Sequence, residues 1–208
     1  MLATPYAEGA GTVFTVLYIF MMMSPLTTNL FGYEGGGMRA FVLSPVARRT
    51  FLLGKNLALT LITAALVVAG VVAGGLIFRD LTWETVLFAL LAFATSAALF
   101  NAFGNWLSLQ FPKRVEFGKR MGRTGVAGLL MVPFFLALLV PPALAVLGAH
   151  LAGSLAVKYV ILAAFAILSV ATYVLLLAPQ GRQLARRELD ILEAVTGRGG
   201  EGDSEVLG

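Results

Sequence analysis

The chain has 208 residues, of which 59% are hydrophobic and 12% are charged, and it carries a net charge of +4. A soluble domain of this size could not carry so apolar a composition on its surface, so the sequence predicts an all-α integral membrane protein. The absence of cysteine excludes disulfides and cysteine-based metal sites. The basic residues lie in loops beside apolar segments, which is typical of membrane orientation and lipid contact rather than nucleic-acid binding.

The apolar segments predict about five transmembrane helices. They cover approximately residues 12–31, 56–78, 85–110, 124–140 and 155–178. Together they make a transmembrane domain over 1–178, and residues 179–208 are expected to form a cytoplasmic tail that is first amphipathic and then disordered. Pro141-Pro142 interrupts an apolar stretch that continues to Gly153, which predicts a broken or re-entrant segment before the last helix.

Small and polar residues mark two of these segments as helix-packing elements. Ala65, Ala69 and Ala73 lie four residues apart, so we expect the 56–78 helix to be central in the bundle. Near the end of the 85–110 segment, Asn101, Asn105 and Ser108 share one helical face. That polar face could line a transport pathway or bond across helices, and the sequence favours the second because such bonds are common between membrane helices.

The distribution of basic residues predicts the orientation of the chain. If the loop around Arg48 is cytoplasmic, thirteen of the fifteen Lys and Arg residues fall on the cytoplasmic side, leaving Arg79 and Lys158 outside. The N-terminus is then outside, the C-terminus is cytoplasmic and the number of crossings is odd.

The longest polar interruption, residues 29–56, is expected to build a specific structure at the inner membrane surface. Gly35-Gly36-Gly37 permits a sharp turn after the first crossing. Met38, Phe41 and Val42 are spaced as on one face of a helix that runs from Met38 to Ser44 and stops at Pro45. By physical reasoning alone, this short amphipathic helix either anchors the bundle at the interface or binds a partner.

Chemistry within the crossings is sparse. No Asp, Glu, Lys or Arg lies in the middle of an apolar segment, which argues against a carboxylate-based proton-coupled carrier or an intramembrane protease. The chain contains no zinc-protease, serine-hydrolase or phosphate-loop motif, so we expect it not to be an enzyme. Energy for any transport against a gradient must therefore come from another chain.

Three elements of the 29–56 stretch carry a resemblance to a known family. They are the turn Glu34 to Gly37, the Leu-x-Pro element Leu43 to Pro45, and the pair Gly54-Lys55 that opens the next helix. With the basic loop after Phe111-Pro112, this pattern resembles the permease subunits of the type-two, exporter-like ABC transporters. That family usually has six crossings, and this chain lacks the first.

The resemblance implies a permease that couples ATP hydrolysis by a separate subunit to substrate export. The short helix would be the coupling helix that docks on a cytoplasmic ABC ATPase, and the residues implied in docking are Glu34, Arg39, Phe41, Ser44, Pro45 and Arg48. ATP and Mg would bind to the ATPase, so no cofactor or metal is expected in this chain. The further partners implied are a second permease copy or a related permease, in the cell membrane of a prokaryote.

Two other classes of function remain open from the residues. A secondary carrier or channel would need a polar site at the membrane midplane, for which only Ser, Thr and Asn side chains are available. A membrane scaffold protein would need no transport site at all.

Overall fold

The computed structural model describes residues 5–79, 81–114 and 126–196, and within these ranges the chain is helical with no strand. The predicted disorder at the end of the tail lies outside the described residues, as do Lys119, Arg120, Arg123 and Arg198. An all-helical protein is what the apolar composition predicts.

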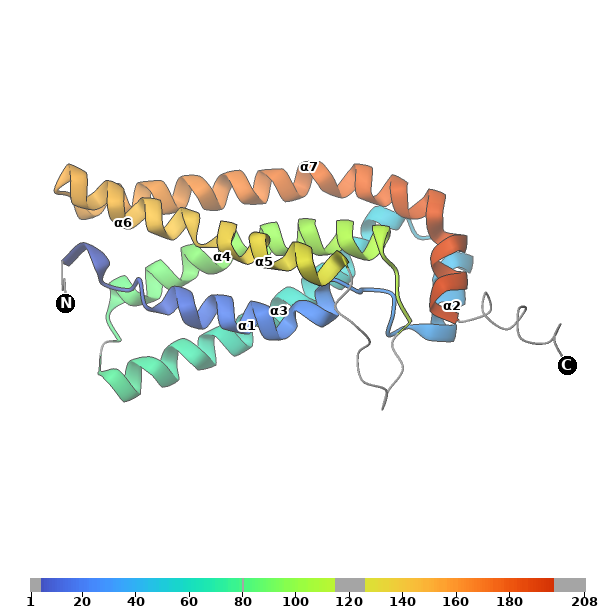
Figure 1. Ribbon diagram of the computed structural model, residues 1–208, viewed down its shortest axis with the longest axis horizontal. Coiled ribbons are helices and arrows are strands. Elements are labelled where there is room, and N and C mark those ends of the chain that lie inside the picture. The colour runs from blue at the N-terminus through green and yellow to red at the C-terminus, as the bar shows by residue number, and fades with distance from the viewer. Residues whose placement is uncertain (1–4, 80, 115–125, 197–208) are drawn as a thin grey trace, which may run out of the picture.

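The long helices run side by side along the long axis of the molecule (Figure 1). One end of the bundle carries η1, the first described element of the chain, and is called the N-terminal end. The other carries α2 and is called the α2 end. The elements are η1 Pro5–Ala7, α1 Thr12–Thr27, η2 Gly35–Gly37, α2 Met38–Leu43, α3 Arg48–Phe78, α4 Trp83–Gln110, α5 Val126–Leu138, α6 Val140–Ala152 and α7 Leu155–Thr196.

Among the described residues, four stretches are long and apolar enough to cross a membrane: α3, α4, residues Gly128–Ala152 of α5 and α6, and α7. This agrees with a multi-pass membrane protein but differs from the five crossings expected. The difference arises in α1, which has 16 residues and ends at Thr27, two residues after Pro25. A proline inside a helix removes a backbone hydrogen bond, and here the helix does not continue to residue 31.

The third of these stretches, Gly128–Ala152, is broken at Leu139, between α5 and α6. Pro141 and Pro142 occupy the first turn of α6, where their missing N–H groups have no intrahelical partner to lose. The helix therefore continues to Ala152, beyond the end expected near residue 140. Figure 1 shows α6 and α5 following one another along the bundle, so the double proline breaks one spanning stretch and does not fold it back.

The central helix is α4. In its most apolar stretch of 18 residues, 56% of the residues are buried, against 22% for the corresponding stretch of α3 and 17% for that of α7. The expectation that the 56–78 helix is central was wrong, because α3 turns Val67 and Val71 inward and leaves Ala65, Ala69 and Ala73 exposed. In α4, by contrast, small side chains lie on several faces and let helices approach from more than one side.

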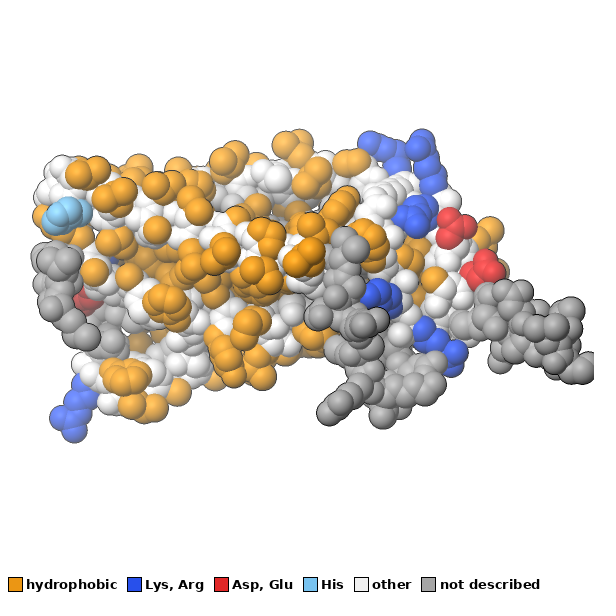
Figure 2. Space-filling view, viewed as in Figure 1, with side chains coloured by type: hydrophobic (Ala, Val, Ile, Leu, Met, Phe, Trp, Pro, Cys, Tyr) orange, Lys and Arg blue, Asp and Glu red, His pale blue; other side chains and the backbone are white. Residues whose placement is uncertain are grey.

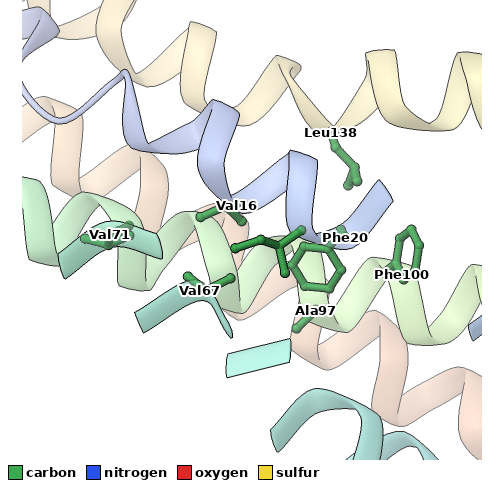
Figure 3. Close-up of a cluster of buried hydrophobic side chains, with 9 residues drawn as sticks. Val16, Phe20, Val67, Val71, Ala97, Phe100 and Leu138 are labelled. Carbon is green, nitrogen blue, oxygen red and sulfur yellow. The ribbon is translucent and has the colours of Figure 1, made fainter. Parts of the chain in front are cut away.

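A hydrophobic cluster joins four helices in the middle of the bundle (Figure 3). Val16 and Phe20 of α1 meet Val67 of α3, and Phe100 of α4 packs against Phe20 with ring centroids 5.1 Å apart. Leu138, at the end of α5, closes the cluster. In a bilayer, such contacts hold helices together by close packing rather than by removal of apolar surface from water.

At the α2 end, α7 continues through Pro179 to Thr196 as one helix of 42 residues, so the expected amphipathic tail is helical and packed. Beyond Pro179 it bends toward α2 (Figure 1). Gly181 allows α7 to approach the start of α3 closely, because a Cβ at this position would lie only 2.8 Å from the backbone nitrogen of Arg49. Leu184, Ile191 and Val195 are buried against the loop between α1 and α3.

Candidate coupling surface

Arg48 fastens α2 to the bundle. Its guanidinium donates to the carbonyl oxygens of Phe41 (3.0 Å), Val42 (2.9 Å) and Ser44 (3.0 Å), at the end of α2. These carbonyls lie at a helix C-terminus, where no further turn supplies N–H donors. The Nε of the same guanidinium donates to Oε2 of Glu188 on α7 at 2.6 Å. Arg48 thus connects the end of α2, the start of α3 and the bent part of α7.

A second ionic contact holds the turn before α2. Lys55 of α3 pairs with the carboxylate of Glu34 and donates to the backbone oxygen of Leu30 at 2.7 Å. Its ammonium also lies 5.4 Å from the ring centroid of Phe51 and 5.6 Å from that of Phe41. A cation so placed gains from both the carboxylate and the ring faces. The loop is therefore fixed to α3 at two points, Lys55 and Arg48.

Between these contacts the underside of α2 is tightly packed. Met38 is 2% exposed, and the rings of Phe41 and Phe51 lie 4.2 Å apart. The space left between α2 and α7 is about 10 Å³, no more than one water molecule needs. The interface has no room for a ligand, so this part of the molecule acts as a rigid base.

The outer side of the same element is an apolar projection, here called the α2 knob and defined by Ala40, Leu43, Pro45 and Val46. Leu43 is 84% exposed and Val46 is 47% exposed, and Ala40 and Pro45 are exposed beside them. Arg39 adds a positive charge to the same side. Exposed apolar side chains on a fixed base, at the end of the bundle where Lys and Arg gather (Figure 2), form a surface suited to protein contact.

The six residues expected to dock a partner divide into two groups. Three of them contact other side chains of the same chain. Glu34 pairs with Lys55, the ring of Phe41 packs against that of Phe51, and Arg48 pairs with Glu188. Ser44 accepts from Arg48 through its carbonyl and from the backbone N–H of Val46 through its hydroxyl. Only Arg39 and Pro45 are exposed.

Sequence reasoning missed the most exposed members of this surface. Leu43 and Val46 flank Ser44-Pro45, and the signal that could have found them was an apolar side chain on either side of a helix stop. Glu188 was also missed, because it follows Arg48 by 140 residues and no local pattern connects the two.

The polar face of α4 bonds to three other parts of the chain. The Nδ2 of Asn101 donates to Oγ1 of Thr60 on α3 at 2.8 Å, and the Nδ2 of Asn105 donates to Oε1 of Gln180 on α7 at 2.9 Å. The Oγ of Ser108 accepts from the backbone N–H of Leu30, after α1, at 3.0 Å. These contacts match the second interpretation of this face, in which polar groups bond between helices.

At the N-terminal end, one buried lysine plays a comparable part. Lys158 of α7 is fully buried and donates to the backbone oxygen of Glu8 at 2.9 Å. Its ammonium lies 5.4 Å from the ring centroid of Phe88 and 5.0 Å from that of Tyr159.

No group of three or more His, Asp or Glu that could hold a metal ion occurs among the described residues. Comparisons with protein-family models, with curated proteins and with solved structures find no match to this chain.

Proposed function

We propose that this chain is the transmembrane permease subunit of an ATP-driven ABC exporter, and that the α2 knob docks on a separate cytoplasmic ATPase subunit. The observation that carries the proposal is the pairing of an exposed apolar knob with a base locked to two spanning helices. An exposed patch on a flexible loop would not transmit force to the membrane helices, whereas a patch that is fixed to the bundle moves with α3 and α7.

The contacts of Arg48 and Lys55 give this proposal a mechanical basis. A displacement of α2 would pull on α7 through Glu188 and on α3 through Lys55. Hydrogen bonds to charged groups contribute about 1.5–3 kcal/mol each, enough to keep the parts together during such a movement. Nucleotide-driven closure of the ATPase would then tilt the helices that carry the substrate path.

The composition of the complex follows from the chain's own lack of an energy source. The ATPase subunit would hold ATP and Mg, and a second copy of this chain or a related permease would complete the membrane part. The basic residues at the α2 end support a cytoplasmic location for the knob, because positive loops stay on the cytoplasmic side of a membrane.

The test is a pulldown of the tagged full chain from its native membranes in mild detergent, with ATP hydrolysis measured on the eluate. The variant is Leu43→Asp, which places a charge on the knob. The matched control is Leu189→Asp, because Leu189 is also strongly exposed at the α2 end, 66%, but lies on α7 outside the knob.

We expect ATPase activity with the wild type and with Leu189→Asp, and its loss with Leu43→Asp. Recovery of the chain without ATP hydrolysis in all three samples would contradict the proposal. Gradient-driven uptake into ATP-free vesicles would then favour a secondary carrier or channel, and absence of uptake would favour a scaffold protein.

A further inference from the structure

A hollow lies on the side of the bundle, between α4, α5 and α7. Its volume is about 390 Å³, within the range of small-molecule sites. It is lined by Leu99, Phe103 and Trp106 of α4, Phe134 of α5, and Leu176 and Gln183 of α7. We call it the lateral groove. It is separate from the α2 knob, and none of the residues of that surface lines it.

One wall of the lateral groove is a stack of aromatic rings. Phe103 and Phe134 are stacked with centroids 4.2 Å apart and an interplanar angle of 14°, and Trp106 also stacks with Phe103, at a centroid distance of 5.7 Å. Trp106 is 36% exposed and Leu176 is 40% exposed, so the groove opens at the outer surface of the bundle. A flat, rigid, apolar wall open to the bilayer suits an extended hydrocarbon chain.

The length of the lateral groove favours an acyl chain over a transmembrane helix as its occupant. On α7 it extends from Thr172 to Gln183, about 17 Å at a rise of 1.5 Å per residue. A spanning helix would need an apolar surface about 30 Å long, whereas one leaflet of the hydrocarbon core is about 15 Å deep. The lateral groove therefore matches the chain of a lipid in a single leaflet.

The ends of the lateral groove differ in polarity. At the end toward the N-terminal side, the hydroxyl of Thr172 is satisfied by the carbonyl of Leu168 in its own helix. At the α2 end the lining is polar, with Gln183, and the exposed Arg186 stands one turn further on α7. Basic side chains at this depth attract anionic headgroups.

We propose that the lateral groove binds one acyl chain of an anionic phospholipid from the leaflet on the α2 side, with its headgroup beside Gln183 and Arg186. This site does not depend on the proposed function and would exist whether or not the chain serves an ATPase.

The experiment uses tryptophan fluorescence, because the chain has only two tryptophans. In Trp83→Phe, the remaining Trp106 reports from the wall of the groove. The full-length variant is placed in phosphatidylcholine vesicles that contain the same minor fraction of either phosphatidylglycerol or phosphatidylcholine with bromine on the acyl chains. Bromine quenches a tryptophan that it touches.

We expect brominated phosphatidylglycerol to bind beside Trp106 about fivefold more strongly than brominated phosphatidylcholine, since a basic residue near an anionic surface is worth about 1 kcal/mol. Arg186→Gln should remove this preference, and Arg39→Gln, the same charge change on α2, should keep it. Thr172→Phe should block the groove and abolish the preferential quenching, and Ala171→Phe should not, because Ala171 is exposed outside the groove.

Equal quenching by the two lipids, unchanged by Thr172→Phe, would overturn the proposal by showing ordinary contact with bulk lipid. Absence of quenching by both would overturn it by showing that protein covers the groove. Circular dichroism checks that Thr172→Phe folds. If Thr172→Phe does not fold, the surface variant Arg186→Gln still tests the preference for the anionic lipid.

Discussion

At both ends of the bundle, a basic side chain binds backbone carbonyls of a connecting segment, but the two ends differ in what they leave exposed. Lys158, at the N-terminal end, is fully buried and holds the segment before α1 through the carbonyl of Glu8. Arg48, at the α2 end, binds the last carbonyls of α2 and pairs with Glu188, while Leu43 beside it remains 84% exposed. The first arrangement only closes the bundle, whereas the second supports a projecting apolar surface.

The difference follows from the geometry of the two cations. A guanidinium has several N–H donors in a fixed plane, so Arg48 can satisfy carbonyls of a helix end and a carboxylate at the same time. An ammonium is a compact charge, and within the described part of the chain Lys158 donates to one backbone carbonyl, that of Glu8, while two rings lie near it. At the α2 end, Arg48 thus holds the end of the short helix to the start of α3 and to α7.

The largest expected effect comes from removing that arginine. Arg48→Ala should lower the free energy of unfolding by about 3 kcal/mol, because several charge-assisted hydrogen bonds are lost together. For a chain of this size that corresponds to a fall in Tm of roughly 6–12 °C in detergent. Hydrogen exchange should rise over residues 38–46 and stay unchanged over residues 6–10.

Two further variants sharpen this result. Arg39→Ala, an exposed arginine on α2 itself, should leave Tm nearly unchanged. Combining Arg48→Glu with Glu188→Arg should restore only part of the loss, because the reversed pair leaves the carbonyls of Phe41, Val42 and Ser44 without their donor. Full rescue would mean that the ion pair alone holds α2.

The next largest effect on stability is expected where α7 approaches α3 closely. Gly181→Ala should destabilise the protein by about 2 kcal/mol, because the added Cβ meets the backbone of Arg49 at 2.8–2.9 Å and must push the helices apart. Gly54→Ala is the matched control, since nothing lies within 4 Å of a Cβ at that helical glycine. It should be neutral or stabilise α3 by up to about 1 kcal/mol. Thermal unfolding of both variants checks this, and equal effects would refute the close contact.

A smaller effect is expected at the N-terminal end. Lys158→Met keeps the volume and removes one charge-assisted hydrogen bond, so the expected loss is about 1.5 kcal/mol. Hydrogen exchange should increase over residues 6–10 and remain unchanged over residues 38–48. Increased exchange over α2 in this variant would contradict the prediction by showing that the two ends of the bundle are coupled.

The smallest expected effect concerns the polar face of α4. A double-mutant cycle of Asn105→Ala and Gln180→Ala should give a coupling energy of about 0.6 kcal/mol, the average for polar contacts between membrane helices. Equilibrium unfolding of the four proteins in detergent would measure it. A coupling energy near zero would mean that the two amides do not interact.

Local patterns in the sequence were sufficient to predict several parts of the fold. The short helix expected from Met38 to Ser44 is observed from Met38 to Leu43, and the double proline at 141–142 lies beside the break between α5 and α6. Both depend on the spacing of neighbouring residues and on the restricted backbone of proline. The end of α1 at Thr27 also follows from proline, but hydropathy alone extended that segment to residue 31.

Features that depend on packing between distant segments were not predicted. Ala65, Ala69 and Ala73 suggested a central helix, yet small residues do not tell whether a helix faces other helices or the bilayer. Glu188, which pairs with Arg48, and Gln180, which accepts from Asn105, both lie on α7, more than 70 residues away in the chain. Glu34 and Arg48, which the resemblance implied in docking, also bind Lys55 and Glu188 within the chain, and no local pattern predicted these pairs.

Site-specific photo-crosslinking tests directly whether the α2 knob contacts an ATPase, as we propose. A photoreactive amino acid replaces Leu43 in the full chain, and in a matched sample it replaces Leu189, which is exposed at the same end but outside the knob. We expect the crosslinker at position 43 to capture a nucleotide-binding subunit that hydrolyses ATP, and the crosslinker at position 189 not to capture it. Capture of no ATPase at position 43, or equal capture at both positions, would contradict the proposal.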